Sequence, residues 1–161
     1  MRRNQQLQHY FERSPGDPPP IEVSVTRRLQ FSESDPLGIA WHGNYSKFFE
    51  QAYTELSHRC GFDNDRLEEE HVSALFYTDR YDYRIPLRCD AVFHTTAAIV
   101  WTEAPRINIE YSVRLDDGRV AATGCTTQVF IDARDFTPVW HIPRFWEEFL
   151  NRWKKGEYHH G

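Results

Sequence analysis

The chain has 161 residues, which is enough for one domain with one substantial hydrophobic core and short for two. It carries 19 Lys and Arg residues against 24 Asp and Glu residues, a net charge of −5. This balance argues against nucleic-acid binding, because such binding relies on a cationic surface. Aromatic residues make up 15% of the chain, so they are numerous enough to line a pocket.

The three cysteines, Cys60, Cys89 and Cys125, lie far apart and show no Cys-x-x-Cys spacing. An odd, scattered set is typical of reduced thiols in a reducing compartment. No apolar run approaches the length of a membrane span, and no apolar stretch follows the basic N-terminus as a secretory signal requires. We therefore expect a soluble, cytoplasmic protein that has no membrane partner.

The N-terminal third contains a leader, a strand and a turn. Residues 1–20 are predicted to be a flexible leader, because "PGDPPP" at 15–20 favours an extended polyproline conformation. "IEVSVTRRLQF" at 21–31 alternates apolar and polar residues and predicts a strand. "DPLG" at 35–38 places Asp, Pro and Gly where a type I turn favours them.

A long helix is predicted over 44–61, "NYSKFFEQAYTELSHRCG". Asn44 is a good N-cap and Gly61 a plausible terminator. Phe48, Ala52 and Leu56 fall on one face, so the helix has an apolar stripe to bury. A short polar helix is expected to follow within "DNDRLEEEH".

The second half of the chain reads as strands and one further helix. Val, Ile, Thr, Tyr and Phe are abundant in four stretches, and the Asp-Gly pair of "RLDDGRV" predicts a hairpin between the last two. "IPRFWEEFLNRW" predicts an amphipathic helix with Pro143 in its first turn, and residues 155–161 are expected to form a disordered tail. The predicted strands are 72–85, 91–103, 106–116 and 119–131.

This order of elements predicts an α+β fold for a single domain over residues 21–154. The long helix must bury its stripe, and a curled antiparallel sheet is the only large surface available to it. We therefore expect a five-stranded antiparallel sheet wrapped around a central helix. The outermost strands would expose their edges, which dimerisation could cover.

One segment, "SDPLGIAWHGNYSKFFE" at 34–50, resembles the motif of the 4-hydroxybenzoyl-CoA thioesterase family. That motif has an Asp in a D-x-x-G turn, an apolar pair, an aromatic residue or His, and then N-Y at the start of the central helix of a hot-dog fold. "RVAATGCTTQVFID" at 119–132 and "HIP" at 141–143 extend the resemblance to residues 22–150. It implies a hot-dog fold with a C-terminal helix, and an acyl-CoA thioesterase whose active site lies at the interface of a homodimer or homotetramer.

The resemblance also implies roles for single residues. Asp35 would attack the thioester carbonyl or activate a water, and the backbone N–H of His42 would polarise the carbonyl oxygen. Taken alone, Asp35 is better explained as a cap of its turn, and a lone His42 as a structural or surface residue. In combination they fit thioester hydrolysis, because a helix N-terminus offers unpaired amides beside a carboxylate. The substrate-binding residues implied are Gly38, Ile39, Trp41, Asn44, Tyr45 and Arg106.

Some of these residues would contact the acyl group and one would contact CoA. Trp41 and Tyr45 would shape the acyl pocket, although plain core packing explains them as well. Arg106 would meet the phosphates of CoA, because a guanidinium suits phosphate binding. No metal or cofactor is expected: His58 and Cys60 are two apart on a helix and point to different faces.

A second hot-dog lineage uses a Glu on the central helix after an H-G-G motif, but "HGNY" lacks the second Gly. The position nearest to that Glu holds Gln51, and Glu50 lies about 100° around the helix, so we expect it to face elsewhere. Two other functions remain open. One is hydrolysis of an acyl carrier protein thioester, since the predicted CoA loop has one arginine. The other is acyl-CoA binding without hydrolysis, against which Asp35 argues.

Overall fold

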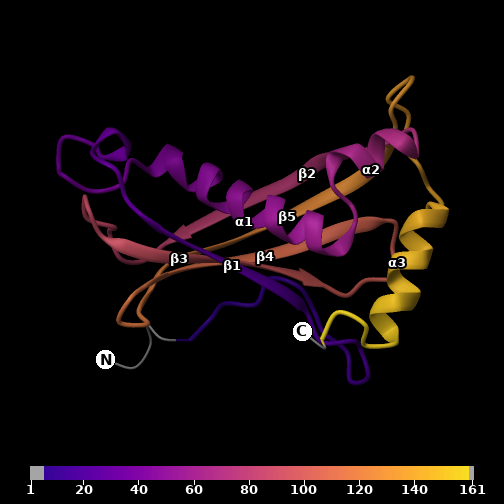
Figure 1. Cartoon of the computed structure of the whole chain (residues 1–161), viewed down its shortest axis with the longest axis horizontal. Helices are drawn as coiled ribbons and strands as arrows, with labels where there is room; N and C mark the ends of the chain where they lie inside the picture. The colour runs from indigo at the N-terminus through magenta and orange to yellow at the C-terminus, as the bar shows by residue number, and fades with distance from the viewer. Residues whose placement is uncertain (1–5, 160–161) are drawn as a thin grey trace.

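A computed structural model of the protein describes residues 6–159 (Figure 1). A long helix lies across one face of an antiparallel sheet, and a second helix closes one end of that sheet (Figure 1). The elements are β1 (Ile21–Arg28), η1 (Phe31–Glu33), η2 (His42–Asn44), α1 (Tyr45–Cys60), α2 (Asn64–Glu69), β2 (Val72–Tyr83), β3 (Val92–Val100), β4 (Arg106–Leu115), β5 (Val120–Asp132) and α3 (Arg144–Lys154).

The sheet has five strands in the order β1-β3-β4-β5-β2, and every pairing is antiparallel. The predicted α+β architecture is therefore confirmed, and so is the Asp-Gly hairpin, in which Gly118 has a φ of 84° between β4 and β5. The chain does not place β2 beside β3. Instead β2 crosses to the far edge and pairs with β5, which leaves β1 and β2 as the two edge strands.

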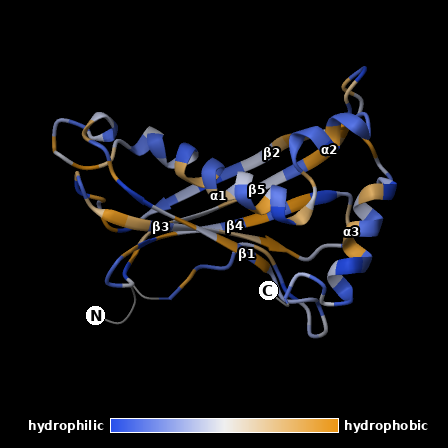
Figure 2. Cartoon of the chain, viewed as in Figure 1, coloured by the Kyte–Doolittle hydropathy of each residue, from blue (hydrophilic) through white to orange (hydrophobic). Residues whose placement is uncertain are grey.

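Helix α1 forms because its apolar residues recur on one side and its end is capped. Phe48, Ala52 and Leu56 are fully buried against the sheet. Gly61 adopts a φ of 74° at the C-cap, a left-handed conformation that favours glycine, and confirms the predicted terminator. Hydrophilic and hydrophobic residues both occur along α1 and α3, as expected of helices with one buried face (Figure 2).

Phe49 of α1 packs directly over Gly124 of β5. A Cβ at Gly124 would lie 2.6 Å from the Phe49 ring and 2.2 Å from the carbonyl oxygen of Arg80. The same ring stacks on Tyr111 with centroids 4.4 Å apart and on Tyr81 at 5.1 Å. Glycine is therefore required here, because any side chain would push the helix off the sheet.

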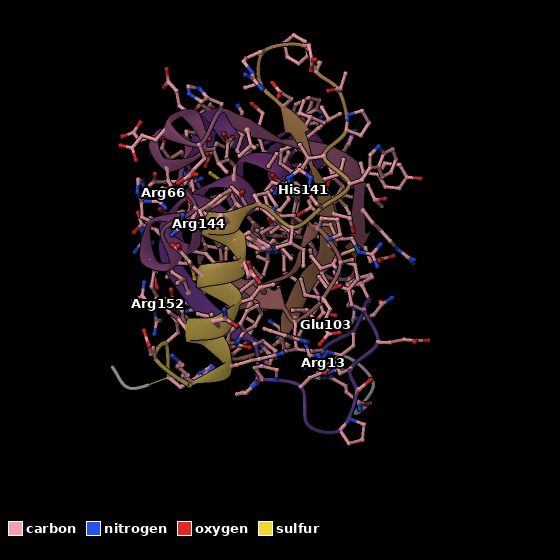
Figure 3. The ribbon with its side chains drawn as sticks, turned by 90° about the vertical axis from the view of Figure 1, so that its right-hand side faces the viewer. Arg13, Arg66, Glu103, His141, Arg144 and Arg152 are labelled. Atoms are coloured by element: carbon pink, nitrogen blue, oxygen red, sulfur yellow. The ribbon has the colours of Figure 1, made fainter. Side chains whose placement is uncertain are left out.

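Helix α3 packs aromatic side chains against the end of the sheet. Trp146 and Trp153 are each 1% exposed, and Trp146 meets Phe130 of β5 edge-on at 5.2 Å. Pro143 occupies the N-cap, one position before the first turn in which it was predicted. Figure 3 looks onto this helix, with Arg144 at its start and Arg152 near its end.

The N-terminal segment lies on the sheet face opposite α1 (Figure 1). Glu110 of β4 is only 7% exposed and accepts hydrogen bonds from the Arg13 guanidinium and the Tyr10 amide, both at 2.7 Å. The Tyr10 hydroxyl donates to Asp82 at 2.6 Å. Residues 6–13 thus contact the domain, which differs from the expected leader set apart from it. Beyond α3, the buried Tyr158 likewise packs on the helix.

The contact at Gly124 predicts a large effect of one methyl group. Gly124→Ala should lower the free energy of unfolding by about 1–3 kcal/mol, because the new Cβ collides with a backbone carbonyl and a fixed ring. Urea denaturation followed by circular dichroism measures the change. Gly43→Ala is the matched control: the three atoms nearest to its Cβ all belong to the Trp41 side chain, which is half exposed and therefore has room to turn aside. Equal stability of the two variants would contradict the prediction.

Candidate active site

Asp35 lies in a short hairpin formed by residues 34–40. The Gly38 amide donates to the Asp35 carbonyl at 2.9 Å and closes the predicted turn. Gly38 has a φ of 72°, so the turn is followed by a residue in the left-handed region, as in hairpins with a three-residue loop. The Asp35 amide then donates to the Ile39 carbonyl at 2.8 Å, and Ser34 and Ala40 form a bridge below it.

The hairpin also orients the Asp35 carboxylate. Its Oδ1 accepts the Leu37 amide at 2.8 Å and lies 3.5 Å from the Ile39 amide. These contacts are the capping role expected of an Asp before Pro. The side chain is partly exposed, and Oδ2 has no hydrogen-bond partner within residues 6–159. One oxygen therefore fixes the carboxyl group while the other stays available.

The hairpin is fixed to the body of the domain by the segment before β3. The Ala40 amide donates to the Leu87 carbonyl at 2.8 Å, and the Cys89 amide donates to the Gly38 carbonyl at 2.9 Å. Ile39 and Arg88 form a bridge between these two bonds. The turn that carries Asp35 is thus held like a short extra strand.

Asn44 joins the hairpin to the start of α1. Its side-chain amide donates to the Glu33 carbonyl at 2.8 Å, and the same carbonyl accepts the Trp41 amide at 3.0 Å. Asn44 stands at the N-cap of α1, but its backbone is already helical and its side chain makes no cap, so the predicted capping role is wrong. The Glu33 carboxylate pairs with Arg27, a contact that no local pattern indicated.

The helical backbone begins at His42, because η2 runs directly into α1. The amide of a first helical residue has no carbonyl acceptor within the helix and stands at its positive end. The His42 carbonyl accepts the Tyr83 hydroxyl at 3.3 Å, which links the helix start to β2. Tyr83 in turn meets Tyr45 edge-on at 4.9 Å, and burial raises the pKa of Tyr45 to about 12.

Trp41 and Tyr45 occupy different environments on either side of His42. Trp41 is half exposed, and its ring lies over Gly43. Tyr45 is 4% exposed and packs on Phe48 in the core. The segment 34–44, which carries Asp35 and His42, lies at the end of the sheet where α1 begins (Figure 1).

A groove of about 1090 Å³ runs between α1 and the strands β2 and β5. It starts at Ser46, in the first turn of α1, and continues past Phe49 and Tyr53 to His58. Its strand wall combines aromatic and polar side chains. That wall includes Phe76, Asp79, Tyr81, Tyr111, Thr126 and Gln128.

Two residues do not lie where a site built from one chain would need them or where the sequence predicted them: Arg106 and Glu50. Arg106 is the first residue of β4 and lies nine positions before Leu115, so it is about 30 Å from the end of the sheet that holds Asp35. Glu50, expected to face elsewhere, lines the groove, while Gln51 faces β1 and accepts a hydrogen bond from Arg27. The sequence predicted that Glu50 and Gln51 lie about 100° apart around the helix, but not that the Glu50 side of the helix faces the groove.

Among residues 6–159, no three His, Cys, Asp or Glu side chains are grouped closely enough to hold a metal ion. In the same part of the chain, no helix is both long and apolar enough to cross a membrane.

The chain belongs to the thioesterase-like superfamily, whose sequence model matches residues 29–152. A curated protein of Aquifex aeolicus (strain VF5), named "Putative esterase", is 34% identical over 67 residues. That match covers 42% of this chain and 52% of the relative, so it spans about half of the relative's length.

Solved structures share the fold. A DHNA-CoA thioesterase from Staphylococcus aureus superposes with a TM-score of 0.73 at 19% identity, over 84% of this chain and 91% of that one. A second Staphylococcus aureus protein, solved in complex with CoA, gives 0.73 at 16% identity over 83% and 84% of the two chains. At these identities the likeness defines a hot-dog fold.

The bond between Asn44 and Glu33 predicts a measurable loss of stability. Asn44→Ala should lower the free energy of unfolding by about 1–3 kcal/mol, because the Glu33 carbonyl loses one of its two donors and the buried Asn44 side chain loses its hydrogen bond. Hydrogen exchange should also show faster exchange of the Trp41 amide. The control is Ser46→Ala, an exposed position on the same helix, which should change stability by less than about 0.5 kcal/mol. An unchanged Asn44→Ala protein would contradict the assigned role.

Proposed function

We propose that the protein is an acyl-CoA thioesterase of the 4-hydroxybenzoyl-CoA thioesterase type, which hydrolyses an acyl-CoA to the free acid and CoA. The observation that carries this proposal is the fixed hairpin, which presents the Asp35 carboxylate at the end of the sheet where α1 begins. Membership of the thioesterase-like superfamily supports the reaction class. The fold neighbour solved with CoA supports CoA as the leaving group.

In this mechanism Asp35 acts on the thioester carbonyl carbon. Either its free carboxylate oxygen attacks, the CoA thiolate leaves, and water hydrolyses the resulting anhydride, or the carboxylate takes a proton from a water that attacks directly. In both routes the carbonyl oxygen becomes an oxyanion that accepts the N–H of His42. One preorganised donor of this kind is worth about 3–4 kcal/mol of transition-state stabilisation.

The neighbouring residues would hold the substrate. Gly38 and Ile39 shape the turn that Asp35 requires, and Asn44 keeps that turn beside the helix start. Trp41 is exposed enough to cover a bound thioester, whereas Tyr45 supports the site from the core.

A homodimer would complete the site. The edge strand β2 exposes Leu75, Phe76 and Tyr77, which are 55%, 57% and 77% exposed, and an apolar edge of this kind favours pairing with another strand. Two copies of β2 paired antiparallel would bring the Asp35 end of one copy beside the opposite end of the other. Arg106, at that opposite end, would then approach the partner's thioester site and could bind the phosphates of CoA.

Removal of the Asp35 charge should abolish hydrolysis. Asp35→Asn should lower kcat by about 10²–10⁴-fold on any acyl-CoA that the wild type cleaves, because the amide neither attacks nor takes a proton. Release of free thiol, corrected with an enzyme-only blank for the three cysteines, measures the rate.

The matched control is Glu50→Gln, which removes the carboxylate in the groove and should retain most of the activity. Loss of turnover in Glu50→Gln together with retention in Asp35→Asn would assign the reaction to Glu50 instead. If the wild type cleaves no CoA ester, acylated carrier protein is the next substrate to assay, and failure there as well would favour a binding module.

A charge in the β2 edge should separate the two copies. Tyr77→Glu should shift the molecular mass measured by light scattering from dimer to monomer, and it should lower hydrolysis in parallel, because each site uses both copies. Ser24→Glu, an exposed position on the other edge strand, β1, is the control and should leave the mass unchanged. A wild type that is monomeric and active would contradict the shared site.

A further inference from the structure

Gln128 is a groove residue with a buried hydrogen-bond donor that lacks a partner. It is 2% exposed, and its Nε2 has no hydrogen-bond partner within residues 6–159. Three other buried side-chain atoms in that part of the chain also lack partners, in Thr95, Trp146 and Tyr158, but none of these residues lines the groove. A buried donor without a partner is costly to fold, so its position on the groove wall needs an explanation.

The surroundings of Gln128 form a polar cluster of four residues: Tyr53, Tyr111, Thr126 and Gln128. The Tyr53 hydroxyl donates to Gln128 Oε1 at 3.3 Å, and the hydroxyls of Tyr111 and Thr126 lie 3.3 Å apart. Burial raises the pKa of Tyr53 to about 12, so its hydroxyl stays protonated at neutral pH. The cluster therefore carries no charge and suits a neutral polar group.

The side-chain amide of Gln128 has one atom, Nε2 or Oε1, without a hydrogen bond in either of its two orientations. As described, Tyr53 donates to Oε1 and the Nε2 donor is free. If the amide were turned over, Nε2 would donate to the Tyr53 oxygen and Oε1 would be free. A hydroxyl group satisfies both cases because it donates and accepts.

The polar cluster lies further along the groove than the start of α1. Tyr53 lies seven positions after Ser46, the residue at the start of the groove, which places the cluster about 10 Å further along α1. Phe49 and Phe76 line the groove wall and offer apolar contact to a hydrocarbon chain. An acyl group that enters from the His42 end must therefore be elongated to reach Gln128.

We propose that Gln128 is a specificity residue that selects elongated acyl groups carrying a hydroxyl remote from the thioester. This inference rests on the proposed thioesterase function and adds the chemical class of its acyl group. A site built to bind a hydroxyl rejects the analogue that lacks it, because its own polar atom then remains buried and unpaired. A plain hydrocarbon chain of the same length would leave the free polar atom of Gln128 buried and without a hydrogen bond.

The test compares matched substrates that differ by one oxygen. Hexanoyl-, octanoyl-, decanoyl- and dodecanoyl-CoA are assayed beside their ω-hydroxy derivatives, and kcat/KM is measured for each pair. The wild type should prefer the hydroxylated member at least about tenfold at the length that reaches the cluster. In Gln128→Leu the ratio at that length should fall to near one.

Thr127→Val is the control, because Thr127 is the next residue on β5 and its hydroxyl donates to Asn108 rather than into the groove. This variant should keep the wild-type ratio. Gln128→Met serves as a second apolar replacement if the leucine variant folds poorly. Equal rates for both members of every pair, or a preference that survives in Gln128→Leu and Gln128→Met, would overturn the proposal.

A binding measurement distinguishes recognition of the acyl hydroxyl by Gln128 from the hydrolysis reaction. Thioether analogues of the same CoA esters, which cannot be hydrolysed, are titrated by calorimetry into the wild type and Gln128→Leu. At least about tenfold tighter binding of a hydroxylated analogue to the wild type alone supports recognition by Gln128 even if no ester is cleaved. Cleavage of the esters with equal binding of both analogues would leave the thioesterase function in place and remove the role of Gln128.

Discussion

The contact of Phe49 with Gly124 determines the position of α1 on the sheet. Because β5 has no side chain at this point, the ring reaches the backbone and stacks between Tyr81 and Tyr111. The depth of α1 on the sheet fixes the width of the groove on one side of the helix. It also fixes where the helix starts, and so where the His42 amide lies.

From that fixed helix, the candidate catalytic group is positioned by main-chain bonds of its hairpin and by the side-chain amide of Asn44. The carbonyl of Glu33 accepts the Trp41 amide and the Asn44 side chain, which joins the hairpin to the helix. The hairpin in turn orients Asp35 through an amide of its own turn. Within residues 6–159 the acid is therefore held without an ion pair that would occupy its second oxygen.

Local signals made much of this structure predictable from the sequence. The Asp-Pro-Leu-Gly turn, the helix that ends before Gly61 and the Asp-Gly hairpin each depend on a few adjacent residues. The features that were missed depend on residues distant in the chain. The pairing of β2 with β5 decides which side of α1 bears the groove, and hence that Glu50 rather than Gln51 lines it. The partner of Asn44, eleven residues away, is likewise set by the folded hairpin.

The N-terminal segment contacts the sheet although its composition is that of a linker. Its prolines and polar residues suggest a linker, yet Glu110 depends on Arg13 and on the Tyr10 amide for its hydrogen bonds. The sheet is thus sandwiched between a helix and an extended peptide that has no secondary structure of its own. A protein trimmed at Ile21 would bare a carboxylate in the middle of a sheet surface, where it would repel any apolar partner that settled there. The segment therefore also governs what can stack on that side of the molecule.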